Sequence, residues 1–145
     1  MRSIIKIFFF LISISPFCVK SQCDSLNHYL YGDNKNIKEI GRFIVEEQPT
    51  FPGGDSAKNA FLKTTIKALI TKTPDSTYGK VFLTFLIDEK GNIKYPCVLR
   101  GFSPILDSIA IATIRKMPKW IPAKQRGNPV SLPFNFIIDF GSIMK

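Results

Sequence analysis

The chain has 145 residues, 45% hydrophobic and 21% charged, which suits one modest core and leaves little room for a second domain of ordinary size. Its formal net charge is +9. The basic positions between Arg100 and Arg126 have few interleaved aromatic residues, so nucleic acid is a poor candidate partner. A solvated basic face is the simplest interpretation of this stretch, and a surface for an acidic partner or an anionic polymer is the alternative.

The first 22 residues have the pattern of an export signal. Arg2 and Lys6 precede a short apolar run that extends to about residue 15. This run is shorter than the roughly 20 apolar residues that a membrane-spanning helix needs. We therefore predict a signal peptide over residues 1–22 that is cleaved near Gln22 and directs the mature chain to the periplasm or cell envelope. A short, uncleaved inner-membrane anchor over the same residues is the alternative.

Cleavage at that point would make Cys23 the first residue of the mature chain and leave Cys97 as the other cysteine. An oxidising compartment permits a disulfide between them. We favour the simpler interpretation, in which Cys97 is a small strand residue and Cys23 a thiol in the tail. Lys20 and Gln22 argue against lipid modification of Cys23, because a lipoprotein signal has small residues just ahead of its cysteine.

Residues 23–48 show no lasting period and are predicted to form a lead-in or tether. The prolines and glycines from Pro49 to Gly54 indicate a loop. After this loop Asp55 or Ser56 can cap a helix, because apolar residues then recur at helical spacing. We predict that the folded domain covers residues 49–141.

A hairpin is predicted next. Apolar side chains from Lys80 to Ile87 fall on both faces of a strand, which is typical of a central strand. Residues 88–92 supply a tight turn around Gly91, and alternating residues up to Leu99 form the returning strand. The adjacent acids of this turn are explained by its composition and do not indicate a glycosidase.

A second helix is predicted to begin at Ser103, which caps it, with Pro104 in its first turn, and to end before Pro118. Residues 122–129 are predicted to form a polar loop. Alternating apolar residues over 132–140 then indicate a last strand.

Two prolines predict the order of the strands. Pro96 lies in the second strand and Pro133 in the third, and a proline cannot donate to the ladder of a central strand. We therefore predict an α+β fold with a three-stranded antiparallel sheet and two helices packed on one face. The elements run helix, strand, strand, helix, strand, and the first strand of the hairpin is central. The last strand keeps an open edge.

Short motifs occur in a fixed order through most of the predicted domain. They are Phe51-Pro52-Gly53-Gly54, Gly79-Lys80-Val81, Phe85-Leu86-Ile87-Asp88, Gly91-Asn92-Ile93, Gly101, Pro104, Leu106-Asp107, Met117-Pro118-Lys119-Trp120, Pro122 and Gly127-Asn128-Pro129-Val130. Together they resemble the TonB C-terminal domain of Gram-negative envelope proteins. The resemblance implies a non-catalytic protein that binds TonB-dependent outer-membrane transporters in energy-coupled transport, with inner-membrane motor proteins as further partners.

The resembled family holds a short transporter segment on its last strand. Carried over to this chain, the resemblance implies strand addition at Leu132, Pro133, Phe134, Asn135, Phe136, Ile137 and Ile138. The alternatives are that this edge is covered by the tail 141–145, by the lead-in, or by a second copy in a homodimer.

This chain departs from the family in two ways. Family members commonly carry a Tyr-Pro pair after the first helix, in a segment that resembles part of the receptor contact, and this chain has Ala68 and Leu69 there, which weakens the expectation of that contact. Energy-transducing members also have an uncleaved N-terminal membrane helix and a long proline-rich spacer, and neither is evident here, so the resemblance supports the fold more than energy transduction. A free-standing module that binds envelope proteins or cell-wall material is therefore the alternative function. The single histidine, His28, lies in no catalytic or metal-binding pattern, so we predict no catalytic residue, metal or cofactor.

Overall fold

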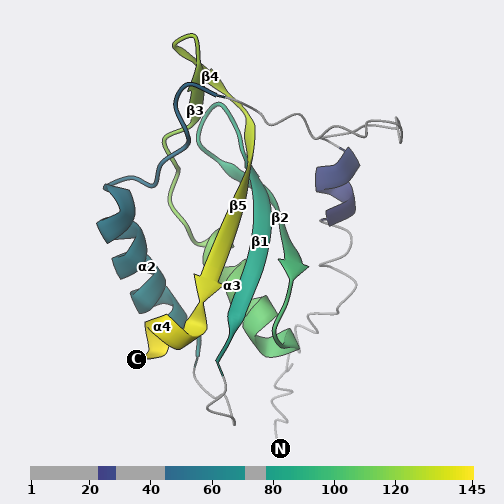
Figure 1. The fold of residues 1–145 in the computed structure, drawn as a ribbon, viewed down its shortest axis with the longest axis vertical. Helices are drawn as coiled ribbons and strands as arrows, with labels where there is room; N and C mark the ends of the chain where they lie inside the picture. The colour runs from purple at the N-terminus through teal and green to yellow at the C-terminus, as the bar shows by residue number, and fades with distance from the viewer. Residues whose placement is uncertain (1–22, 29–44, 71–77) are drawn as a thin grey trace, which may run out of the picture.

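The computed structural model describes residues 23–28, 45–70 and 78–145. After a helical segment at residues 23–28, the labelled elements of Figure 1 are α2 (Gly54–Leu69), β1 (Lys80–Ile87), β2 (Ile93–Arg100), α3 (Pro104–Arg115), β3 (Ala123–Gln125), β4 (Asn128–Val130), β5 (Leu132–Asp139) and α4 (Phe140–Met144). Within those described ranges, no helix has the length and apolar character needed to cross a bilayer. The predicted leader of residues 1–22 lies outside them.

The main sheet has the predicted order, with β1 between β2 and β5 and both pairings antiparallel. β1 is buried on both faces along most of its length, as its apolar pattern indicated. Pro96 and Pro133 lie in the two flanking strands, where a missing N–H costs the sheet least.

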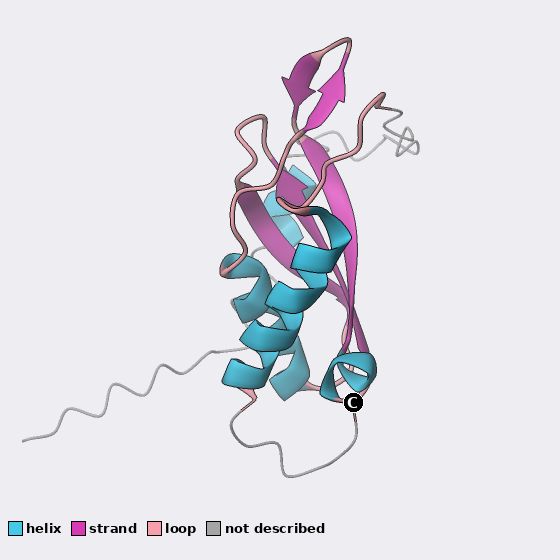
Figure 2. Ribbon diagram, turned by 90° about the vertical axis from the view of Figure 1, so that its left-hand side faces the viewer, coloured by secondary structure: helices cyan, strands magenta, loops and turns pink. Residues whose placement is uncertain are grey.

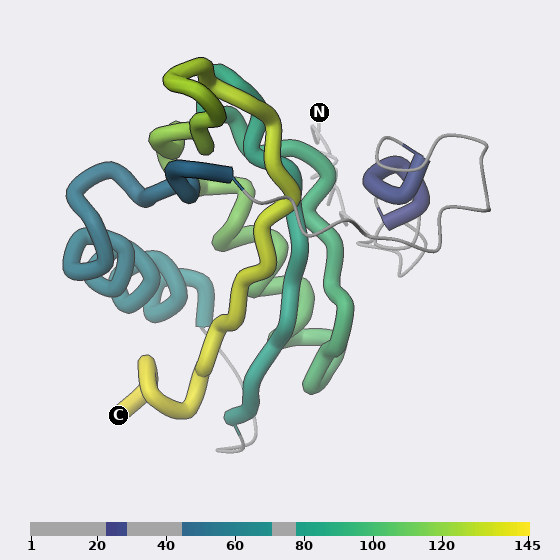
Figure 3. Tube along the Cα trace, turned by 45° about the horizontal axis from the view of Figure 1, so that its top comes forward, coloured from purple at the N-terminus to yellow at the C-terminus, as the bar shows by residue number. Residues whose placement is uncertain are grey.

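Helices α2 and α3 pack on the same face of this sheet, as Figure 3 shows from above. Leu62 and Ile66 of α2 and Ile114 of α3 enter one core with Phe85 of β1. Ser103 caps α3 as predicted, since its side chain accepts a hydrogen bond from the backbone N–H of Leu106 at 3.3 Å. The predicted α+β fold with two helices on one face is confirmed.

The start of α2 differs from the prediction that Asp55 or Ser56 caps it. Gly53 occupies the N-cap with a φ of 84°, and no side chain caps the helix. The Asp55 carboxylate pairs with Lys58 one turn along. Glycine adopts this left-handed conformation at little cost, so the chain turns into α2 without a polar cap.

Residues 122–129 were predicted to form a polar loop, and that prediction is wrong for most of the segment. β3 and β4 form a two-stranded hairpin that Figure 2 shows beyond the end of the main sheet. Arg126 and Gly127 both have positive φ, the geometry of a tight two-residue turn. The β3 side of the hairpin also meets the incoming chain, where Glu47 and Lys124 exchange backbone hydrogen bonds of 3.1 and 3.0 Å.

Cys23 and Cys97 form a disulfide, which corrects the interpretation of these residues as a tail thiol and an unpaired strand residue. Figure 3 shows the helical segment 23–28 on the sheet face opposite α2 and α3. Cys97 faces this side together with Thr84, its neighbour on β1, and Leu26 is only 3% exposed. The disulfide thus forms together with the burial of Leu26 from the lead-in. No local sequence pattern predicts this contact between distant segments.

Candidate functional site

β5 provides an open edge of the main sheet. It pairs with β1 in unbroken antiparallel register, from Ile87 opposite Leu132 to Lys80 opposite Asp139. Among the described residues no strand pairs with its other side, and Figure 1 shows it as an outer strand. All the residues that the sequence assigned to partner binding lie in this one strand: Leu132, Pro133, Phe134, Asn135, Phe136, Ile137 and Ile138.

One hydrogen bond identifies the backbone groups of β5 that point away from β1. The N–H of Phe140 donates to the carbonyl of Gly79 at 3.1 Å, one step beyond the pair of Asp139 and Lys80 in the same register. Hydrogen-bonded and non-hydrogen-bonded pairs alternate along an antiparallel ladder. The even-numbered residues of β5 therefore bond to β1, while Asn135 and Ile137 direct their N–H and C=O groups outward.

Pro133 has the same outward direction as these two residues but contributes only a carbonyl. Its missing N–H therefore leaves the inner ladder intact. Over residues 133–137 the outward edge of β5 thus offers two donors, on Asn135 and Ile137, and three acceptors, with the Pro133 carbonyl as the third.

The side chains of β5 divide between the two faces. Phe136 and Ile138 are buried in the core, whereas Asn135 is exposed and Ile137 is 55% exposed on the opposite face. Phe134 is half-buried, and its ring centroid lies 5.1 Å from that of Trp120. A partner strand on this edge would meet backbone groups held by a packed core on one side.

The tail after β5 does not extend the sheet. Phe140–Met144 forms α4, which packs against α2 and the start of β1. The Asp139 carboxylate accepts a hydrogen bond from the backbone N–H of Ser142 at 3.1 Å and forms an ion pair with Lys80 at 3.4 Å. The hydrogen bond and the ion pair lower the pKa of Asp139. The tail therefore forms no strand beside β5. The sequence interpretation missed this helix, although Asp139 is a residue type that favours helix N-caps.

The opposite edge of the sheet, β2, is a poorer template for an added strand. Its pairing with β1 shifts register between Phe82 and Leu83 and again between Thr84 and Leu86. Tyr95 has a φ of 52°, and Pro96 follows it. Bulges and prolines are devices by which proteins protect sheet edges, so the β5 edge is the more regular of the two.

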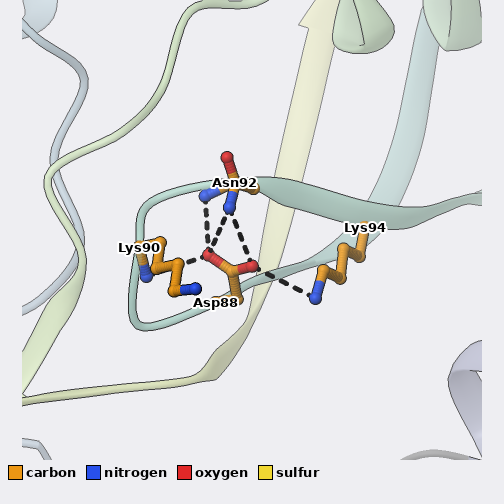
Figure 4. Close-up of polar contacts among 4 residues, drawn as sticks. All are labelled: Asp88, Lys90, Asn92 and Lys94. Carbon is orange, nitrogen blue, oxygen red and sulfur yellow. Dashed lines mark hydrogen bonds and ion pairs between the residues drawn. The ribbon is translucent and has the colours of Figure 1, made fainter.

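The hairpin turn between β1 and β2 uses its acidic residue for structure. The buried carboxylate of Asp88 accepts hydrogen bonds from the backbone N–H groups of Lys90 and Asn92 at 3.0 and 2.8 Å and from the Asn92 amide, and pairs with Lys94 at 3.2 Å (Figure 4). Burial alone raises the pKa of Asp88, but the hydrogen bonds from Asn92, Lys94 and Lys90 outweigh it and lower the pKa to about 2. These contacts account for the acid without a catalytic role.

This turn also supports Trp120, whose ring lies beside β5. The backbone N–H of Trp120 donates to the carbonyl of Gly91 at 2.9 Å, and the indole ring packs on Phe51, Phe85, Phe134 and Phe136. At 4% exposure, Trp120 seals one end of the core. The turn and Trp120 therefore help to hold the part of β5 that contains Phe134.

Metal-ligand chemistry has no assembled site in the part of the chain that the structure describes, where no group of three or more His, Cys, Asp or Glu side chains is placed to hold an ion. The predicted basic stretch is dispersed. Arg100 lies over the ring of Phe82, Lys124 pairs with Glu47, and the backbone of Arg126 bonds to Glu46. Arg115 and Lys119, by contrast, line one shared cavity.

Residues 75–141 match the family model described as the C-terminal domain of the Gram-negative bacterial TonB protein. The matched segment runs from just before β1 through β5 and contains all three strands of the main sheet. Neither a curated protein nor a solved structure matches the chain significantly.

Proposed function

Because residues 75–141 belong to the TonB C-terminal domain family, we propose that this chain is a non-catalytic protein of the cell envelope that binds TonB-dependent outer-membrane transporters. An extended transporter segment adds to β5 as a fourth strand at Leu132–Ile138 and takes part in energy-coupled transport. The family model supports an envelope protein of the TonB type with outer-membrane transporters as its general partners. The strand, its residues and the coupling are our proposal.

The outward backbone groups of Asn135 and Ile137 carry this proposal. They lie on a strand whose pairing with β1 has no bulge, and a buried core holds the strand from behind. Backbone hydrogen bonds to such an edge give affinity for any extended segment, and alternate side chains give selectivity. The exposed side chains of Asn135 and Ile137 are available for that selectivity.

The disulfide supports export. Disulfides persist in oxidising compartments such as the bacterial periplasm, and Cys23–Cys97 joins residues 74 positions apart. We therefore place the domain, predicted over residues 49–141, in the periplasm, with residues 1–22 as its export signal.

The test compares two substitutions of Ile137. Ile137→Pro removes an outward donor and leaves the ladder with β1 intact, whereas Ile137→Ala removes the side chain and keeps the donor. The binding partners are synthetic peptides that cover the periplasmic segments of TonB-dependent transporters from the same cell. We expect Ile137→Pro to weaken the best peptide by about tenfold or more and Ile137→Ala to weaken it less.

Amide hydrogen exchange of the wild-type protein gives a second measurement. The N–H groups of Asn135 and Ile137 should gain protection when the peptide binds, whereas that of Phe136 should already be protected in the free protein. Strand addition at β5 would be ruled out if a folded Ile137→Pro variant bound the peptide as tightly as the wild type. Unchanged hydrogen exchange at both outward amides would rule it out as well.

A free-standing envelope module without energy transduction is the second candidate. It is favoured by the absence of a Tyr-Pro pair in α2, where Ala68 and Leu69 stand. Fractionation bears on the choice between the two functions, because retention in the inner membrane favours energy-coupled transport and release of a soluble mature protein favours the free-standing module.

A further inference from the structure

A cavity of about 250 Å³ lies on the far side of β1 from β5, between the end of α3, the loop after it and the start of β2. Its apolar lining includes Ile93 and Pro96 of β2, Ile114 of α3 and Met117 of the loop. Arg115 and Lys119 add two cationic side chains to the same lining, and no carboxylate lines it. We name this site the α3 cavity.

Both cations of the α3 cavity lack an acidic partner among the residues that the structure describes. Two other lysines of the domain are paired, Lys94 with Asp88 and Lys124 with Glu47. Within the described ranges, Arg115 and Lys119 form no ion pair, and both are exposed. Their charges are therefore available to an anionic ligand beside an apolar cavity.

The walls of the α3 cavity are held by backbone hydrogen bonds. The N–H of Met117 donates to the carbonyl of Ile114 at 3.1 Å, which closes the last turn of α3. Trp120 follows Lys119, and its backbone N–H donates a hydrogen bond to the carbonyl of Gly91. Asp88 holds Asn92, another lining residue, through both its backbone and its side-chain amide. The cavity is thus preformed, which reduces the entropy lost on binding.

The size and charge of the α3 cavity limit its occupant. Its volume is below the roughly 300–1,000 Å³ of sites for drug-sized ligands and suits a single large side chain. We propose that the α3 cavity binds an acidic peptide segment of a partner protein, with one apolar side chain inside and flanking carboxylates at Arg115 and Lys119. A strand on β5 would lie at the opposite edge of the sheet, so this site goes beyond the function proposed above.

The test uses a fluorescein-labelled peptide, Gly-Glu-Phe-Glu-Gly, and a second in which glutamine replaces both glutamates. The variant Arg115→Gln/Lys119→Gln neutralises the cavity, and Lys63→Gln/Lys67→Gln removes the same charge from exposed positions of α2. We expect the cavity variant to weaken the acidic peptide by about tenfold and the α2 variant by less than about twofold. The glutamine peptide should bind the wild type more weakly than the acidic one.

Nuclear magnetic resonance locates the bound peptide. The methyl signals of Ile93 and Met117 should shift when the acidic peptide binds to the wild-type protein. Equal weakening by the two double variants would mean attraction to net charge alone, and this outcome would overturn the proposal. Unshifted methyl signals would overturn it as well. Ile137→Pro should leave this binding unchanged, so failure at one site is distinguishable from failure at the other.

Discussion

At Gly91 the backbone leaves no room for a side chain. It adopts a φ of 78°, and a Cβ atom there would lie 1.9 Å from the carbonyl oxygen of Trp120. Gly127 has a similar φ of 75° but nothing within 4 Å of its Cβ position. We expect Gly127→Ala to lower the free energy of unfolding by about 1 kcal/mol and Gly91→Ala by about 3 kcal/mol, because the second change adds a collision to the strain.

Urea denaturation of the two glycine variants checks this expectation. Equal losses of unfolding free energy would mean that the hairpin moves away from Trp120 at little cost. The close approach would then contribute little to the position of the indole ring beside β5.

Asp88 makes the free energy of unfolding depend on pH. Its pKa in the folded protein is about 2, below the ordinary value of 3.8, so the carboxylate stabilises the fold above about pH 4. That contribution is lost as the pH falls from about 4 to about 2, where the folded protein takes up the proton. Asp88→Asn should therefore lower the free energy of unfolding by about 1–2 kcal/mol at pH 7, and the difference from wild type should shrink towards pH 2.

Urea denaturation at pH 7 and at pH 2.5 measures the effect of Asp88. Asp55→Asn is the matched control, because Asp55 is an exposed acid with a lysine partner and an exposed ion pair contributes little to the free energy of unfolding. A wild-type to Asp88→Asn difference that is the same at both pH values would contradict the assignment.

At the scale of elements, the disulfide joins the helical segment 23–28 to β2. It closes a loop with a sequence separation of 74, for which the chain-entropy account gives about 4 kcal/mol of stabilisation. We expect a reductant to lower the free energy of unfolding of the wild type by an amount of that order. The double variant Cys23→Ser/Cys97→Ser should have this lower free energy of unfolding both with and without the reductant. A wild-type protein whose stability is the same with and without reductant would refute the link.

For the whole molecule, the state of Cys23 connects export to the fold. We expect the mature protein, isolated from the cell envelope, to begin after residue 22 with Cys23 oxidised to Cys97. A sulfur atom in a disulfide cannot also carry a lipid through a thioether, so the same protein should have no lipid mass. Intact mass measurement before and after reduction decides this. A chain that begins at Met1 and fractionates with the inner membrane would favour the anchor and, with it, energy transduction.

Sequence alone determined the elements whose signals are local. Ser103 and Pro104 set the start of α3, the apolar run of Lys80–Ile87 made β1 central, and the prolines placed β2 and β5 beside it. These features follow from capping, burial and missing backbone donors, all of which act within a few residues. The candidate edge was predictable for the same reason, because Pro133 marks it.

Only the tertiary structure decided which contacts unite distant segments. The disulfide, the pairing of Glu47 with Lys124 and the β3–β4 hairpin beside it depend on surfaces that meet after the core has formed. The alternation of residues in β5 predicted its buried face, but the outward direction of the Ile137 N–H required the register with β1. A strand's own sequence does not state which of its two backbone edges is already paired, since that choice belongs to its neighbour.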